Sequence, residues 1–181
     1  MSNGPLSEVV DYYTRFAEES RLALGPSQLE FERSKELLGR FLRQPPARVV
    51  DVGGAAGAYG FWLASLGYEV HLVDATSRLV DEARRRNVLS PHPLASVSVG
   101  DARRLSIADE SSDVVLLLGP LYHLPERPDR MAALHEARRV LRKNGVVFVA
   151  GISRYAATLD GLARNLALDP HIVNMREKAP C

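Results

Sequence analysis

Cysteine is almost absent from this sequence, and so is any excess of charge. The single cysteine, Cys181, is the last of 181 residues, so the chain can form no internal disulfide and no cysteine-rich zinc site. Its 23 Lys and Arg residues balance 22 Asp and Glu residues, and a net charge of +1 gives no general electrostatic reason to bind nucleic acid or an acidic membrane. We therefore expect a protein of a reducing compartment that binds neither.

Long apolar runs are also missing. No run approaches the roughly 18 residues of a membrane span, and the first residues carry acidic side chains where a signal peptide would carry positive charge. The chain is long enough for one well-packed core but short for two. We therefore expect one soluble, cytoplasmic domain over residues 1–181, with a helical segment at 1–43, a sheet core at 47–151 and a short C-terminal part at 152–181.

The sequence does contain an alternation of helical and strand-like segments, which predicts an α/β fold. Two helices are predicted within residues 1–43, separated by Gly25-Pro26. Asn144-Gly145 is expected to end a later helix. Further helices are expected at 58–66, 77–87, 128–142 and 159–168. Short runs rich in Val, Leu and Ile are expected to be buried parallel strands, at Arg48–Val52, Tyr68–Val73, Ala95–Val99, Asp113–Leu118 and Val146–Ala150.

The first of these strands runs into a loop of small residues, Gly53–Gly57, before the next helix. Small side chains let a ligand approach the backbone at a helix N-terminus. The second strand ends at Asp74, whose carboxylate can accept hydrogen bonds from both hydroxyls of a ribose. A plain tight turn is the alternative for the loop, but the loop and Asp74 together indicate an adenosine-type cofactor.

Two such cofactors are a nicotinamide dinucleotide and S-adenosylmethionine. The dinucleotide fingerprint Gly-x-Gly-x-x-Gly fails because, counted from Gly53, its third and sixth positions are Ala55 and Ala58. Asp51 precedes the first glycine by two residues, where a carboxylate would repel a pyrophosphate but suits the amino group of a methionine moiety, directly or through water. The loop favours S-adenosylmethionine, with a nicotinamide oxidoreductase as the weaker alternative.

These motifs resemble those of the class I S-adenosylmethionine-dependent methyltransferases. The first motif of that family is an acid, any residue, then Gly-x-Gly-x-Gly, and it stands here as Asp51, Gly53, Ala55 and Gly57. An alanine at the middle glycine costs about 1 kcal/mol if the position needs a positive φ. The later motifs follow in order, at Asp74, Gly100-Asp101-Ala102 and Asp113-Val114-Val115.

The resemblance implies a doubly wound, Rossmann-like α/β fold with a mostly parallel sheet in the order 3-2-1-4-5 and helices at the N-terminus. It also implies that Asp101 bonds the adenine amino group, that Ala102 offers its backbone N–H to the ring, and that Tyr13 belongs to a lid. A turn aspartate is the alternative for Asp101, and core packing is the alternative for Tyr13. The cofactor-binding residues expected on this basis are Tyr13, Asp51, Gly53, Gly54, Ala55, Gly57, Asp74, Ala75, Asp101, Ala102 and Leu118.

Methyl transfer from an activated sulfonium needs alignment and desolvation more than it needs catalytic side chains. The segment Leu118–Leu124 follows the fourth strand at the carboxyl end of the sheet. It lacks the Asn/Asp-Pro-Pro-Tyr motif of enzymes that methylate nucleobase or glutamine amino groups, so we expect a small-molecule acceptor. His123 is the candidate base, with Tyr122 beside it. The alternative is that both residues only line the pocket. No metal site is predicted.

The family has seven strands, and only five are predicted here, so the final β-hairpin of the family has no counterpart. The strand at 146–150 would then be an open apolar edge, which pairs with other chains unless it is covered. We expect the chain either to form a homo-oligomer through this region or to be a fragment of a longer protein. A non-enzymatic alternative, suggested by Ala55 and by the early end of the chain, is a partner subunit or sensor that binds S-adenosylmethionine without turnover.

Overall fold

The computed structural model describes residues 26–163 of the chain. The chain divides between Ala150 and Gly151 into two compact units. The described part of the second unit contains the helix α6 (Ala156–Ala163), which overlaps the helix expected at 159–168. The first predicted helix, and Tyr13 within it, lies outside the described residues.

The first unit is built on a five-stranded sheet in which every strand runs parallel to its neighbours. Its order is β3-β2-β1-β4-β5, which confirms the predicted order. The first four strands lie within one residue of their predicted bounds, because each is a short apolar run between turn residues. The strands are β1 (Arg48–Val52), β2 (Glu69–Asp74), β3 (Ser96–Val99), β4 (Ser112–Leu117) and β5 (Leu141–Val149).

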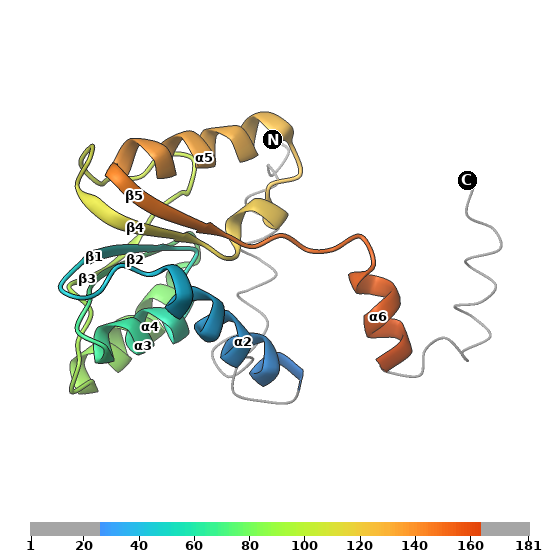
Figure 1. Cartoon of the computed structure of the whole chain (residues 1–181), viewed down its shortest axis with the longest axis horizontal. Helices are drawn as coiled ribbons and strands as arrows, with labels where there is room; N and C mark the ends of the chain where they lie inside the picture. The colour runs from blue at the N-terminus through green and yellow to red at the C-terminus, as the bar shows by residue number, and fades with distance from the viewer. Residues whose placement is uncertain (1–25, 164–181) are drawn as a thin grey trace. The chain divides into compact units, whose positions relative to one another are not determined.

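Helices cover both faces of this sheet (Figure 1). Because successive side chains of a strand point to opposite faces, β1 contributes to two cores. Val49 packs in one core with Leu63, whereas Val50 packs in the other with Ala137 and Val140. Burying each such valine stabilises the fold by about 1.5–3 kcal/mol. The helices are α2 (Pro26–Phe41), α3 (Ala58–Ser65) and α4 (Ser77–Leu89) toward the first core, α5 (Arg127–Val140) toward the second, and the short 3₁₀ helix η2 (Pro120–His123).

The start of β5 differs from the prediction. The helix α5 ends at Val140 rather than at Arg142, and Leu141 already pairs with Ser112. Regular pairing resumes only at Val146, which is opposite Val114. Asn144-Gly145 therefore does not end the helix. It lies in a bulge within the strand, where Asn144 adopts a φ of +65° that few residue types tolerate.

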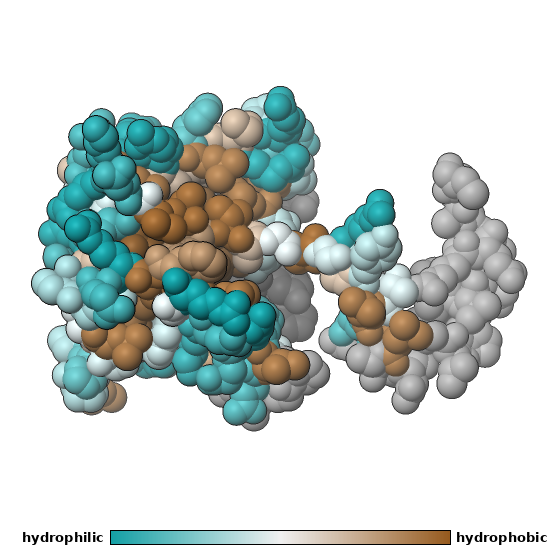
Figure 2. Space-filling model, viewed as in Figure 1, coloured by the Kyte–Doolittle hydropathy of each residue, from teal (hydrophilic) through white to brown (hydrophobic). Residues whose placement is uncertain are grey.

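The expectation that all five strands are buried is wrong for the two outer ones. No residue of β3 is fully buried, and Val146, Val147 and Val149 of β5 are 36%, 39% and 47% exposed. An apolar area covers the face of the unit on which β5 lies (Figure 2). Burial is set by position in the sheet, because β1 and β4 have a strand on each side and an edge strand has only one.

Two arginines fasten the connection between β3 and β4 to α5. Arg103 binds the carboxylate of Asp101 and reaches Asp129, in the first turn of α5, at 2.9 Å. Arg139 of α5 donates to the carbonyl oxygen of Leu105 at 2.9 Å. The segment that follows β3 is therefore anchored to a helix of the core. Within residues 26–163, no helix is both long enough and apolar enough to cross a bilayer.

Candidate functional site

A cavity lies where the strands of the sheet reach their carboxyl ends. Parallel strands bring these ends to one edge of a sheet, and ligands of open α/β folds bind there. The cavity is lined by residues that the sequence singled out, namely Asp51, Gly53, Gly54, Ala55, Asp74, Ala75, Asp101, Ala102, Leu118, Tyr122 and His123. Gly57 is not among the lining residues. Its φ of +87° and its N–H, which donates to the carbonyl of Gly54 at 2.8 Å, shape the turn before α3.

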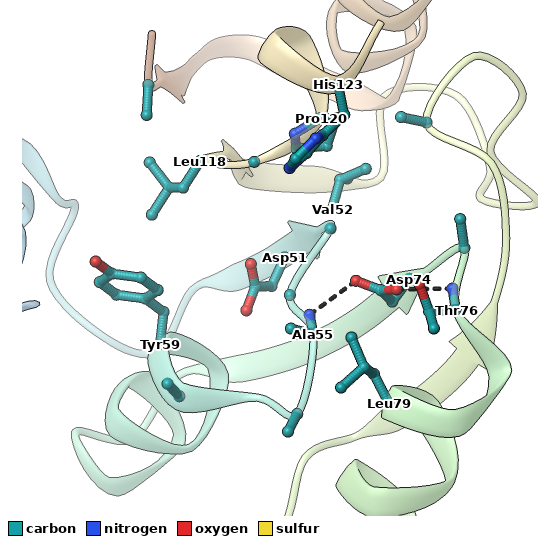
Figure 3. Close-up of a pocket in the computed structure, with 18 of the residues that line it drawn as sticks. Asp51, Val52, Ala55, Tyr59, Asp74, Thr76, Leu79, Leu118, Pro120 and His123 are labelled. Atoms are coloured by element: carbon teal, nitrogen blue, oxygen red, sulfur yellow. Dashed lines mark hydrogen bonds between the residues drawn. The ribbon is translucent and has the colours of Figure 1, made fainter. Parts of the chain in front are cut away.

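Other residues of the wall escaped the sequence argument. Glu30 and Ser34 of α2 both line the cavity, and their spacing of four residues places them on one face of the helix. That spacing alone could not distinguish a cavity wall from a solvated face. Tyr59 extends into the cavity from the first turn of α3 (Figure 3). Its position directly after the glycine loop was the usable signal.

Asp74 connects the two loops that border the cavity. Its side chain is buried, with Oδ2 accepting the N–H of Ala55 at 2.9 Å and Oδ1 accepting the N–H of Thr76 at 2.8 Å (Figure 3). Burial raises the pKa of Asp74, and the N–H groups of Thr76 and Ala55 oppose that rise. An ionised carboxylate has about four acceptor positions, so acceptor capacity is left for a ligand.

Ala55 occupies the position where the resemblance led us to expect a glycine. Its φ is +49°, in the left-handed region, so the condition under which an alanine is costly is met. Gly53, with a φ of +73°, is needed for a second reason as well. A Cβ at this position would lie 2.8 Å from Cδ of Pro120. The loop therefore stores strain at Ala55 and uses glycine where Pro120 of η2 closes over it.

We expect Ala55→Gly to raise the free energy of unfolding by about 0.5–1 kcal/mol. Relief of the left-handed alanine, worth about 1–2 kcal/mol, exceeds the extra chain entropy of glycine. Urea denaturation at constant pH measures the change. Ala58→Gly is the matched control, because Ala58 begins α3 and glycine weakens a helix. If Ala55→Gly lost as much stability as the control variant, the left-handed conformation of Ala55 would not be a source of strain.

Asp51 is the most buried acidic side chain among the described residues. It is 2% exposed, and its Oδ2 has no hydrogen-bond partner. Burial and the negative charge of Asp74 raise the pKa of Asp51 to about 7, while the backbone N–H of Gly60 opposes the rise. Gly54 leaves room for this carboxylate, since a Cβ there would lie 2.7 Å from Oδ2. Asp51 thus lines the cavity without a charged partner.

Asp101 differs from Asp51 because an arginine already binds it. Arg103 donates to Asp101 from Nη2 at 2.6 Å, from Nε at 3.0 Å and from its backbone N–H at 2.9 Å. Burial raises the pKa of Asp101, but the bonds from Arg103 outweigh burial and lower it overall. Asp101 therefore forms a turn, as the alternative expected, and it also lines the cavity, whereas its bond to adenine stays a prediction.

His123 and Tyr122 follow β4 on the short helix η2. Their rings are tilted by 60°, with centroids 4.6 Å apart. Burial lowers the pKa of His123, and the carboxylate of Asp74 opposes that change. The imidazole is therefore mostly neutral at pH 7, and the neutral form is the one that a general base requires. Among residues 26–163, no group of three or more His, Cys, Asp or Glu side chains could hold a metal ion.

Comparison with known proteins identifies the family. Residues 50–149 match the model of the methyltransferase domain family, which is more than half of the chain. The chain therefore belongs to this methyltransferase family. Its class, fixed by the sheet order and by the cavity at the strand ends, is the Rossmann-like methyltransferase fold.

The individual proteins that the chain resembles are only distantly similar to it in sequence. The chain is 30% identical over 141 residues to the ubiquinone biosynthesis O-methyltransferase of Xanthomonas campestris pv. campestris, covering 75% of this chain and 53% of that protein. It is 32% identical over 132 residues to the demethylmenaquinone methyltransferase of Beutenbergia cavernae, covering 73% and 50%. The solved PH0226 protein of Pyrococcus horikoshii OT3 superposes with a TM-score of 0.67 at 26% identity, covering 76% and 63%. The chain spans about half the length of the curated relatives it matches.

Proposed function

We propose that this chain transfers a methyl group from S-adenosylmethionine to a small-molecule acceptor. The observation that carries the proposal is the presence of three acids, Asp51, Asp74 and Asp101, at or just beyond neighbouring strand ends around one cavity. S-adenosylmethionine presents an ammonium group, a ribose and an adenine amino group, and all three are hydrogen-bond donors. Three carboxyl groups in one cavity suit such a ligand better than they suit a pyrophosphate.

The residues present fit this cofactor in two further respects. Asp51 lines the cavity without a charged partner, and Gly53 and Gly54 line it beside Asp51 with no side chains in the way. Asp74 would hold the ribose. Asp101 and Ala102 would hold the adenine ring. When bound, the cofactor supplies a methyl group already activated on a sulfonium, so the chain's own residues mainly bind the reactants, align them and exclude water.

The acceptor side of the proposed site is formed by the segment after β4. Leu118, Gly119 and Tyr122 line the cavity there, and they offer apolar and aromatic surface. A partly aromatic acceptor suits such a wall better than an anion does. The names of the two curated relatives refer to ubiquinone biosynthesis and to demethylmenaquinone. A quinone-type acceptor, methylated on oxygen or carbon, is therefore the first class to test.

The test of the proposed function combines binding with product formation. We expect calorimetry to detect binding of S-adenosylhomocysteine, and mass spectrometry to detect a methylated product from a panel of quinone precursors and other small hydroxyl, amine and activated-carbon compounds. Binding without any product across this panel would favour the alternative role, a partner or sensor that binds the cofactor. If the protein does not bind S-adenosylhomocysteine, the proposed function is wrong.

His123 is proposed as the base that accepts a proton from the acceptor. His123→Ala is expected to lower the turnover number by about 10²–10⁴-fold, the usual range for general-base catalysis, with at most a small loss of S-adenosylhomocysteine affinity. The exposed His135 of α5 provides the matched control, and His135→Ala should change neither quantity. If His123→Ala instead weakens cofactor binding strongly and leaves the turnover number at saturating cofactor unchanged, His123 belongs to the cofactor-binding wall.

A further inference from the structure

We propose that Arg86 of α4 is a positioning residue of the cofactor site, which keeps the glycine loop in the conformation that binds S-adenosylmethionine. The inference rests on the proposed function, because that function gives the loop a ligand to hold. It goes beyond the proposed function by assigning a role to a side chain that acts through the loop rather than by its own bond to the cofactor. It also identifies the backbone strain that this side chain opposes.

Arg86 differs in its surroundings from the two arginines that precede it on α4. Arg84 and Arg85 are exposed, and each pairs with an acid three residues earlier on the same helix, Arg85 with Glu82 at 2.6 Å. Arg86 is half-buried and lines the cavity. Its Nη1 donates to the carbonyl oxygen of Ala56, which lies 30 positions earlier in the chain, at 2.7 Å. Arg86 therefore connects α4 with the glycine loop.

An aromatic ring supports the guanidinium of Arg86. Its Cζ lies 4.8 Å from the centroid of the Phe61 ring, a distance at which a cation is attracted to an aromatic face. Phe61 is itself placed against the end of the loop, since its N–H donates to the carbonyl of Gly57 at 2.8 Å and a Cβ at Gly57 would lie 2.9 Å from its ring. A planar guanidinium loses less freedom for each hydrogen bond that it forms than an ammonium does. The ring therefore orients Arg86 toward the loop.

The loop needs outside contacts because much of its backbone is left-handed. Gly53, Ala55 and Gly57 have φ angles of +73°, +49° and +87°. The two glycines adopt this conformation readily, but at Ala55 it is strained. Strained backbone persists only where the surrounding structure holds it in place. A contact close to Ala55 is therefore the one on which the shape of the loop depends most.

Asp74 and Arg86 hold the two residues at the centre of the loop, one from each end. Oδ2 of Asp74 accepts the N–H of Ala55 at 2.9 Å (Figure 3), and Arg86 donates to the carbonyl of Ala56 at 2.7 Å. Both contacts come from one strand and the helix that follows it, because β2 ends at Asp74 and α4 begins at Ser77. Without Arg86, the carbonyl of Ala56 is released, and Ala55 can relax toward a negative φ and away from Asp74.

Calorimetric titration with S-adenosylhomocysteine tests this role. Arg86→Met removes the donor and the charge, and we expect it to bind about tenfold more weakly, since losing one hydrogen bond of ordinary strength changes the population of the binding-competent loop by about that factor. Arg86→Lys keeps a charged donor and should restore the affinity to within about threefold of the wild type. Arg85→Met is the matched control. It removes the same charge from the same helix but leaves the contacts with Ala56 and Phe61 in place, and it should bind as the wild type does.

The Ala55→Gly background separates a role in the loop from a general role in the stability of α4. Glycine adopts a positive φ without strain, so the loop would keep its conformation with less help from Arg86. We therefore expect Arg86→Met to weaken binding only about twofold in this background, which makes the two substitutions non-additive. A role confined to the stability of α4 would give the same loss of affinity in both backgrounds.

The outcomes separate this inference from the proposed function. A wild type that does not bind S-adenosylhomocysteine overturns both. A wild type that binds, with an Arg86→Met variant of equal affinity, overturns the inference alone, as do equal losses in the wild-type and Ala55→Gly backgrounds. A loss in Arg85→Met equal to that in Arg86→Met would assign the effect to charge and also overturn it. If Arg86→Met does not fold, Arg86→Lys provides the same comparison, with a loss of about threefold that should disappear in the Ala55→Gly background.

Discussion

Replacing Asp74 with alanine is expected to weaken S-adenosylhomocysteine binding by about 1.5–3 kcal/mol, or roughly 10- to 150-fold. The proposed ribose bonds would be lost, and each bond to a charged acceptor makes a large contribution in a site shielded from water. The two N–H groups that Asp74 now accepts, on Ala55 and Thr76, would also lose their partner. Calorimetry at fixed pH and ionic strength measures the change.

The control for this variant lies on the same strand. Glu69 begins β2 and forms an exposed ion pair with Arg48, away from the cavity. Glu69→Ala should therefore leave the affinity unchanged. Asp74→Asn keeps the shape but replaces one acceptor oxygen with a donor, so its affinity should fall between those of the wild type and Asp74→Ala. An Asp74→Ala protein that binds as tightly as the wild type would show that the ribose does not lie at Asp74.

Asp51→Asn is expected to stabilise the empty protein at pH 8 by up to about 4 kcal/mol. Folding raises the pKa of Asp51 from its ordinary value of 3.8 to about 7, and each unit corresponds to about 1.4 kcal/mol. Stability from this raised pKa is fully present below pH 3.8 and is lost as the pH rises through 7. Asparagine does not titrate, so its advantage should be absent near pH 4 and largest at pH 8.

Urea denaturation at pH 4, 5, 6, 7 and 8 tests this dependence. Asp81→Asn on the surface of α4 provides the control, because Asp81 is exposed and pairs only with the neighbouring Arg84. Its difference from the wild type should stay within about 0.5 kcal/mol at every pH. If Asp51→Asn is less stable than the wild type at pH 8, the buried carboxylate is not the destabilising group that we describe.

Strand positions could be predicted from the sequence where local pattern and tertiary context agree. Arg48–Val52 is an apolar run between a proline pair and a glycine loop, and the structure has a strand at those residues. Asp74 could be placed for the same reason, since a strand that ends in an acid brings that acid to the edge of the sheet. The family motifs then brought Asp51, Asp74 and Asp101 to one cavity.

Other features depend on contacts between distant residues. The exposure of Val147 and Val149 follows from the place of β5 at the edge of the sheet, which the apolar run itself does not encode. Leu141 continues the helical pattern of α5, yet it pairs with Ser112, 29 positions earlier. The sequence did not predict the ion pair between Asp101 and Arg103, because the position of Arg103 depends on the turn and on Asp129 of α5.

The Arg103 network has a consequence for the kinetics of ligand binding. Asp101, Arg103 and Asp129 hold the adenine side of the proposed site in place before any ligand arrives. The conformational entropy of that segment is therefore lost during folding, and little is left to lose on association. The rate at which a ligand associates with a site preorganised in this way is limited by diffusion and desolvation rather than by loop ordering. The affinity is then determined mainly by the rate at which the adenine end dissociates.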